Sequence, residues 1–385
     1  MAAMLLLPAA LVLYFAFNSG GFYPGAPAYV AVLLCVVVIA RVTFSSTPFA
    51  AISPLLALSA GALALYTLIT LLSGSWSHAT GVARVEFDLP LVYLLAMVLF
   101  GSVPRTRWRL RWMLRGIAAA AVVVCAAGLT SRLLPHVWPT SPTLANNRLS
   151  FPITYWNVLG LLAALGIVLC VHLSSDLREP RVSRVLAAGA VPIVASTLLF
   201  TFSRGGIATC IVALFAYVLI GRPRGLLSSV LTIGPATAIS VKAAYDATQL
   251  ATLDPTTPQA VVQGHHVAVV VAICAAGAVV LRAALVLSLD EQLRRFVLPA
   301  HLRRPTAWAG WVSLAAVAVI AAIALRGTIT REYHGFLRPA VTANPADLRT
   351  RLTDPSNNGR LDEWKLAWRQ FRLRPVLGHG AGTYQ

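Results

Sequence analysis

The chain has 385 residues, of which 58% are hydrophobic and only 11% are charged. Soluble globular proteins carry about a quarter charged residues, so this composition excludes a soluble domain and predicts an integral membrane protein. The formal net charge is +18, but the basic residues flank apolar segments, so the charge does not indicate a nucleic-acid partner.

Eleven apolar runs approach the length of about 17–25 residues that a spanning helix needs. In chain order they lie at residues 1–17, 26–44, 50–72, 86–101, 113–130, 154–173, 185–202, 207–221, 226–243, 265–288 and 306–325. The first run lacks the basic start of a cleaved signal peptide, so we interpret it as a membrane helix. The sequence therefore predicts an all-α polytopic bundle over residues 1–325 and a long external loop over residues 326–385.

The charges of the connecting loops indicate the orientation of the bundle. If the N-terminus is cytoplasmic, the inner loops carry Arg41, Arg105, Arg107, Arg109, Arg111, Arg115, Arg178, Arg181, Arg184, Arg222, Arg224, Arg294, Arg295, Arg303 and Arg304. The short outer loops then carry only Arg84, Arg132, Arg148 and Arg204. This asymmetry follows the positive-inside rule, which exempts long loops. We therefore expect the N-terminus in the cytoplasm and the arginine-rich segment 326–385 outside.

The external loop contains a predicted amphipathic helix. The turn-forming cluster Asp354–Gly359 precedes it, Asp362 and Glu363 suit its first turn, and Pro375 ends it. Leu361, Trp364, Trp368 and Phe371 recur at helical spacing and form an aromatic stripe, with Arg360 at its edge. We expect this helix to lie on the membrane surface or to cap the bundle, with Arg360 toward the headgroups. The glycine-rich segment Gly378–Gly382 beyond it is expected to be flexible.

Ser203-Arg204-Gly205-Gly206 separates the apolar runs 185–202 and 207–221. An unpaired arginine costs roughly 2.5–3.5 kcal/mol at mid-bilayer, so Arg204 either snorkels from a tight turn to lipid phosphates or binds an anion. A guanidinium group can clamp a phosphate, and glycines permit close approach of ligand and backbone. Arg360 is either a solvated charge or a second such group. Both arginines are predicted to face the same compartment, and together they suit a diphosphate.

Acidic residues offer one alternative chemistry. Glu86 and Asp88 could share a divalent metal ion, but acids near a helix entry also favour the helix dipole, and the chain has no Asp-x-Asp motif.

Four further polar features are less specific. His379 could act as a general base, although its neighbours supply no orienting partner. Asn157, inside an apolar run, could contact a sugar or a neighbouring helix. His265 and His266 are adjacent and do not face the same way on a helix, so we assign them to a polar loop. Arg282 falls in the inner half of its run and can snorkel inward, so it receives no role.

The order of four motifs resembles the bacterial O-antigen ligase and O-antigen polymerase superfamily. They are Tyr155-Trp156-Asn157, Phe202-Ser203-Arg204-Gly205-Gly206, Gly359-Arg360-Leu361-Asp362-Glu363-Trp364 and Arg374-Pro375-Val376-Leu377-Gly378-His379-Gly380. The resemblance implies transfer of a glycan from an undecaprenyl-diphosphate carrier to an acceptor hydroxyl, without a nucleotide sugar or an essential metal. It implies that Arg204 and Arg360 bind the diphosphate, near Ser203, Gly205, Gly206 and Asn157.

The resemblance also implies an outer-face reaction at the bacterial cytoplasmic membrane, with no cofactor. In the family a histidine motif and closing helices follow the position of Gln385, so the resemblance implies either a fragment or a degenerate member that cannot catalyse. The base role is not carried over to His379, which precedes the expected place. Ligation of a finished glycan and polymerisation of repeat units share one donor, and the sequence does not separate them.

Two rival functions are a metal-dependent lipid-linked glycosyltransferase that uses Glu86 and Asp88, and a transporter or flippase of an anionic lipid-linked substrate. A transporter should have polar residues along a path through several helices, whereas charges here lie near helix ends and in loops, apart from Arg282.

Overall fold

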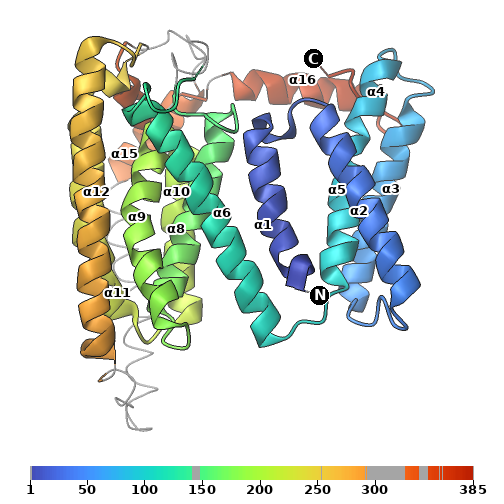
Figure 1. The fold of residues 1–385 in the computed structure, drawn as a ribbon. Helices are drawn as coiled ribbons and strands as arrows, with labels where there is room; N and C mark the ends of the chain where they lie inside the picture. Colours follow the sequence, from blue (N-terminus) through green and yellow to red (C-terminus); the bar gives the residue numbers. More distant parts are fainter. Residues whose placement is uncertain are drawn as a thin grey trace. The chain divides into compact units, whose positions relative to one another are not determined.

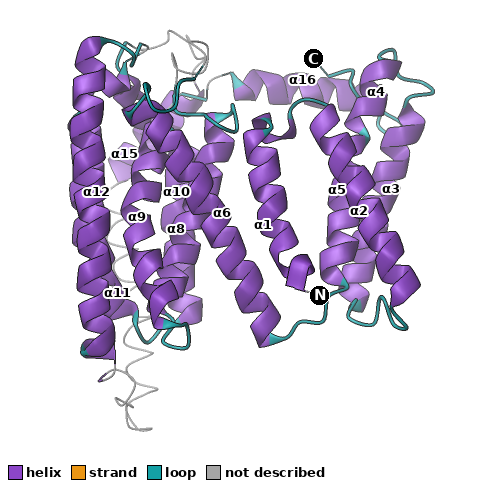
Figure 2. Ribbon diagram, in the orientation of Figure 1, coloured by secondary structure: helices purple, strands orange, loops and turns teal. Residues whose placement is uncertain are grey.

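The computed structural model describes residues 2–140, 148–252, 254–290, 292, 326–337, 346–354, 356–357 and 359–384. These residues form helices and loops, as Figure 2 shows, and the only extended pairing among them is an isolated bridge between Thr252 and Asp347. Eight of the described helices are long and apolar enough to cross a membrane. The predicted all-α polytopic fold is therefore confirmed.

The helices follow the apolar runs closely (Figure 1). In chain order they are α1 (Ala2–Phe17), α2 (Gly25–Phe44), α3 (Pro54–Ser73), α4 (Thr80–Glu86), α5 (Asp88–Gly101), α6 (Arg107–Leu133), α8 (Trp156–Ser175), α9 (Arg181–Phe200), α10 (Arg204–Gly221), α11 (Leu226–Asp246), α12 (Pro258–Leu287), α15 (Arg326–Leu337) and α16 (Arg360–Leu373). Short 3₁₀ turns lie at Ser19–Gly21, Thr248–Ala251 and Leu348–Leu352. Ten of the eleven expected spans coincide with a helix, and the run 306–325 lies outside the described residues.

The start of α12 corrects one expectation. His265 and His266 lie inside this helix and not in a polar loop. The helix begins earlier because Thr257 accepts a hydrogen bond from the Ala260 amide at 3.2 Å and Pro258 occupies the first turn, which are both strong start signals.

The chain divides into two compact units. The first unit comprises residues 1–120, 152–155 and 362–385, and the second comprises residues 121–151 and 156–361. This division describes packing within the protein, so the boundary between a membrane bundle and an external loop at residue 326 stays a prediction.

The first unit is built around α5. Helices α2 and α3 both pack against α5, and a buried cluster of Val30, Leu34, Val92 and Leu99 joins α2 to α5. In the second unit, α9 is central and contacts α8, α11 and α12, while α10 packs against α8. Helices α8 and α9 are the most buried of the candidate spans.

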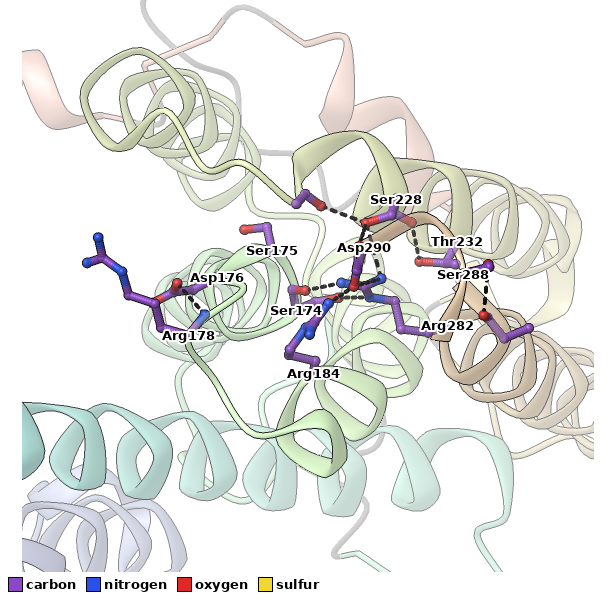
Figure 3. Close-up of polar contacts among 12 residues, drawn as sticks. Ser174, Ser175, Asp176, Arg178, Arg184, Ser228, Thr232, Arg282, Ser288 and Asp290 are labelled. Atoms are coloured by element: carbon purple, nitrogen blue, oxygen red, sulfur yellow. Dashed lines mark hydrogen bonds and ion pairs between the residues drawn. The ribbon is translucent and has the colours of Figure 1, made fainter. Parts of the chain in front are cut away.

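A buried ionic cluster joins four segments of the second unit (Figure 3). Arg184 of α9 and Arg282 of α12 both pair with Asp290, and the Arg282 Nη1–Asp290 Oδ2 distance is 2.9 Å. Ser228 of α11 donates to Asp290 Oδ1 at 2.5 Å, and Arg282 Nε donates to Ser174 Oγ of α8 at 3.0 Å. The two arginines and the aspartate are at most 1% exposed.

The cluster corrects the expectation for Arg282, which was assigned to snorkelling. Its side chain is fully buried and bonded to other helices. A charge can be buried in this way because a carboxylate and hydroxyl groups satisfy it.

Candidate functional site

The turn between α9 and α10 has an unusual backbone. Phe202 has φ of +45° and is buried, and its ring contacts that of Phe200 edge to face. A bulky residue rarely adopts this left-handed conformation, which persists only where the surroundings enforce it. The turn thus holds the following residues, Ser203 and Arg204, in a defined position.

Ser203 ties this turn to α8. Its hydroxyl accepts a hydrogen bond from the Gly206 amide at 3.2 Å and so caps α10. The same hydroxyl donates to Asn157 Oδ1 in the first turn of α8 at 2.9 Å. Of the two partners expected for Asn157, a sugar or a neighbouring helix, the structure provides the second through Ser203.

The two glycines of the motif have different surroundings. A Cβ atom on Gly206 would lie 3.1 Å from the carbonyl carbon of Gly160 in α8, whereas a Cβ on Gly205 would meet no atom within 4 Å. Gly206 therefore permits close packing of α10 against α8. Gly205 has open space around it, so a ligand can still be expected to approach the backbone closely at this residue.

Arg204 contacts the segment that precedes α16. Its Nη2 atom donates to the carbonyl oxygen of Ser356 at 3.0 Å. A guanidinium group has five N–H donors, so one bond to a carbonyl leaves others available for a ligand. Arg204 is half-buried and lies in the first turn of α10, where the helix dipole also favours an anion.

The turn that receives Arg204 is ordered by its own side chains. Asp354 accepts hydrogen bonds from the Ser356 amide at 3.0 Å and from the Ser356 hydroxyl at 2.6 Å. These bonds, together with the nearby charges of Arg204 and Arg351, hold the pKa of Asp354 below its usual value. The carboxylate is thereby kept in the charged form that organises the turn.

Asn357 continues the turn into α16. Its Nδ2 atom donates to the Phe336 carbonyl of α15 at 2.5 Å, and its Oδ1 atom accepts from the Gly359 amide at 2.8 Å. Gly359 has φ of +82°, a conformation that glycine adopts without a steric penalty. Its successor Arg360 begins α16 with an exposed side chain. Arg204 is therefore bonded to the same turn that carries Arg360.

A cation–π contact orders the neighbouring segment before α8. Arg148 Cζ lies 4.0 Å from the centroid of the Trp156 ring, and the Leu149 amide donates to the Phe200 carbonyl at 3.0 Å. The adjacent Asn146 and Asn147 lie outside the described residues. In the predicted Tyr155-Trp156-Asn157 motif, Trp156 thus contacts Arg148, and Asn157 contacts Ser203 at the start of α10.

Helix α16 matches its prediction in both bounds and pattern. It spans Arg360–Leu373, with Asp362 and Glu363 in the first turn. Trp364 and Trp368 are each 60% exposed and Phe371 is 51% exposed. An exposed aromatic stripe of this kind suits an amphipathic helix, and its location on the membrane surface or against the bundle stays a prediction.

The glycine-rich segment Gly378–Gly382, which we expected to be flexible, forms hydrogen bonds with the end of α3 and the residues that follow it. Ser77 donates to the Ala381 carbonyl at 2.9 Å, and the Ala381 amide donates to Ser73 Oγ at 3.0 Å. Gly380 and Gly382 have positive φ values and approach this region so closely that a Cβ on either would clash at 2.6 Å. The segment is thus fixed by contacts that only glycine permits.

His379 belongs to this bound segment. Its Nε2 atom is buried and has no hydrogen-bond partner among the described residues. His379 lies in the first unit, whereas Arg204 and Arg360 lie in the second. The geometry adds no partner that would orient His379 as a base.

Glu86 and Asp88 lie on either side of a helix junction. Glu86 is the last residue of α4 and Asp88 is the first residue of α5. Within the part of the chain that the structure describes, no three His, Cys, Asp or Glu side chains gather in a metal-binding arrangement.

Comparison with known families bears on the C-terminal part of the chain. Residues 261–385 match the family model described as O-antigen ligase. The C-terminal third of the chain is therefore similar to the O-antigen ligase family. This match confirms the resemblance noted from the motifs, and it includes those at Gly359–Trp364 and Arg374–Gly380 but not Arg204. No curated protein and no solved structure matches the chain.

The O-antigen ligase match and the eight candidate spans together indicate a multi-pass membrane protein with a glycan ligase or polymerase role. The turn at Ser356, which accepts the hydrogen bond from Arg204, and helix α16 both lie within the matched residues.

Proposed function

We propose that the protein transfers a glycan from an undecaprenyl-diphosphate carrier to an acceptor hydroxyl at the outer face of the bacterial cytoplasmic membrane. In this proposal Arg204 and Arg360 bind the diphosphate, and the reaction needs no metal ion. The carrier identity follows from the family resemblance, and the two arginines follow from the motifs and from their common turn.

One observation carries the proposal. The hydrogen bond from Arg204 to the Ser356 carbonyl joins the start of α10 to the turn that begins α16. Each guanidinium group can bind a phosphate with bidentate geometry, so two of them on one junction suit the two phosphates of a diphosphate. Gly205 leaves open space beside them.

The chemistry requires charge stabilisation more than acid catalysis. The bond between the anomeric carbon and the diphosphate oxygen breaks, a bond from that carbon to the acceptor oxygen forms, and the acceptor proton passes to a base. Undecaprenyl diphosphate leaves with the electron pair of the broken bond. Positioned cations stabilise this developing charge, and loss of one such donor typically lowers the rate by about 10²–10³-fold.

The base that deprotonates the acceptor hydroxyl is a different group from the two arginines that bind the diphosphate. We do not include His379 in the mechanism, because its Nε2 atom is buried and its segment is bound to α3. A base must come within hydrogen-bond reach of the acceptor hydroxyl, directly or through one water molecule.

The transporter alternative draws no support from the buried charges. Arg184, Arg282 and Asp290 lie between helices, which the sequence argument did not anticipate. They pair with one another and with Ser174 and Ser228 at one end of the helices. Buried charges that pair in this way join helices, so they give a transport path no specific support.

Sealed, right-side-out vesicles distinguish the two functions. Undecaprenyl-diphosphate glycan with a labelled sugar is supplied to the outer leaflet, and the label is followed by extraction and chromatography. Transfer predicts that label leaves the diphosphate and joins a product, with EDTA having no effect. Intact labelled donor moving to the inner leaflet would contradict the proposal, and loss of transfer with EDTA would favour the metal-dependent mechanism.

A further inference from the structure

A basic pocket lies at the opposite end of the second unit from the Arg204 turn. It is formed where α8 and α10 end and α11 begins, and it has a volume of about 640 Å³. Three arginines line it, Arg178, Arg222 and Arg224. The positive-inside rule predicts this end to be cytoplasmic.

The three guanidinium groups are available to a ligand. All three side chains are exposed, and none forms a hydrogen bond or ion pair with another side chain in the described part of the protein. Figure 3 shows the Arg178 side chain pointing away from the buried Arg184–Arg282–Asp290 cluster. The acid that lines the pocket, Asp176, already accepts a hydrogen bond from the Arg178 amide at 2.9 Å.

The floor of the pocket supplies a fixed hydroxyl group. The Tyr217 hydroxyl of α10 lies 2.9 Å from Ser175 Oγ and 3.2 Å from His172 Nδ1, both of α8. These contacts orient the phenol and join α10 to α8. Arg222 is held at the end of α10 in a left-handed conformation with φ of +42°, and its amide donates to the Val218 carbonyl at 3.2 Å.

Apolar side chains flank the arginines. Ile220, next to the pocket on α10, is 84% exposed, and Leu227 at the start of α11 is 57% exposed. Exposed aliphatic residues at the end of a spanning helix suit lipid acyl chains, and the adjacent arginines then lie at the level of the phosphate groups. Basic pockets between membrane helices on the cytoplasmic side are suited to anionic lipid headgroups.

We propose that this pocket binds the phosphodiester headgroup of an anionic phospholipid, with Arg178, Arg222 and Arg224 as phosphate ligands. The three arginines and Asp176 give the lining a net positive charge, which favours an anionic lipid over a zwitterionic one. This site is distinct from the diphosphate site at Arg204, and the proposal does not depend on glycan transfer.

The test is a lipid titration of the purified full chain in detergent, followed by native mass spectrometry. The probes are phosphatidylglycerol, phosphatidylcholine and inorganic phosphate. Each surface arginine contributes about fivefold to the binding of an anionic lipid, so Arg222→Gln/Arg224→Gln should weaken phosphatidylglycerol binding by about 25-fold. Arg178→Gln, in a different loop, should weaken it by about fivefold. This second variant keeps the test informative if the double variant does not fold.

Arg181→Gln is the matched control. Arg181 is exposed at the same end of the unit but does not line the pocket, so its loss should leave binding unchanged. Unchanged phosphatidylglycerol binding in the double variant and in Arg178→Gln would overturn the proposal. Equal weakening by Arg181→Gln would also overturn it, because it would indicate a diffuse charge effect. Binding of inorganic phosphate as tight as that of phosphatidylglycerol would assign the pocket to a soluble anion instead.

Discussion

Replacement of Asp290 by asparagine should strongly destabilise the second unit. Asp290 is the carboxylate shared by Arg184 and Arg282, and these three residues are at most 1% exposed. Asparagine keeps the size of the side chain but leaves two buried guanidinium groups without their common counter-charge. Breaking a buried ion pair in this way typically costs about 3–5 kcal/mol, because an uncompensated charge stays buried.

The matched control is Asp246→Asn. Asp246 also accepts from a basic residue, Lys242, at 2.6 Å, but the two side chains are 56% and 75% exposed. Exposed pairs of this kind contribute about 0–1 kcal/mol. Both variants remove one negative charge near a helix end, so their difference isolates the effect of burial.

Unfolding of the purified protein in a mild detergent, followed by tryptophan fluorescence during heating, measures this difference. Asp290→Asn should unfold at a clearly lower temperature than wild type, while Asp246→Asn should stay close to it. The double variant Asp290→Asn/Arg282→Gln should recover part of the lost unfolding temperature, because it also removes one of the two buried positive charges. Equal unfolding temperatures for Asp290→Asn and Asp246→Asn would refute the assigned role of the cluster.

Three other variants test the remaining contacts. Gly206→Ala should lower the unfolding temperature by an amount equivalent to about 1–3 kcal/mol, because its Cβ would lie 3.1 Å from the carbonyl carbon of Gly160. In the control Gly205→Ala the Cβ meets open space, so the unfolding temperature should not change. Equal effects of the two variants would be inconsistent with close packing of α10 against α8. Ser77→Ala removes the hydrogen bond to Ala381 and should speed proteolytic cleavage after Pro375. The control Ser75→Ala loses only a hydrogen bond within its own turn and should not change the cleavage rate. Similar cleavage rates for the two variants would argue against binding of the segment Gly378–Gly382 to the end of α3. The pKa of Asp354 is lowered in the folded protein, so its stabilisation of the turn is present above the unfolded value of about 3.9 and is lost as the pH falls through the lower native value. Hydrogen exchange at residues 346–357, corrected for the intrinsic exchange rates, should therefore rise in the wild type as the pH falls from about 5 to about 3. Asp354→Asn should show raised exchange at both pH values. A wild-type exchange rate that does not change with pH would count against this role of Asp354.

Helix positions could be predicted from the sequence because a spanning helix requires a minimum length of apolar residues. The bounds of α16 could also be predicted, since turn formers precede Arg360 and Pro375 follows Leu373. Such local signals depend only on neighbouring residues, and they were sufficient for ten of the expected spans.

Contacts between distant residues could not be predicted in the same way. Arg282 and Ser174 are 108 residues apart, and Ser77 and Ala381 are 304 apart, so neither pair leaves a pattern in one sequence. Asp290, one of few acids among the inner-end arginines, was the available signal for the buried cluster. Gly206 illustrates a related limit, because a glycine that admits a ligand and one that admits a helix look identical in sequence.

The proposed diphosphate site combines a prediction from local motifs with a contact between distant residues. Arg204 and Arg360 were predicted from their motifs, but their common turn became visible only through the bond to Ser356. That bond also gives Arg204 a structural role, so any test of Arg204 needs a measure of the turn itself. Proteolysis within residues 346–359 provides that measure.

The most direct test of the central claim is the rate of glycan transfer from labelled undecaprenyl-diphosphate donor by membranes containing Arg204→Gln, Arg360→Gln or the control Arg369→Gln. Arg369 is exposed on the same helix as Arg360, so it controls for charge and expression. The diphosphate role predicts a loss of about 10²–10³-fold for each of the first two variants, with normal expression and an intact turn, and no loss for Arg369→Gln. Wild-type transfer by both Arg204→Gln and Arg360→Gln would contradict the claim.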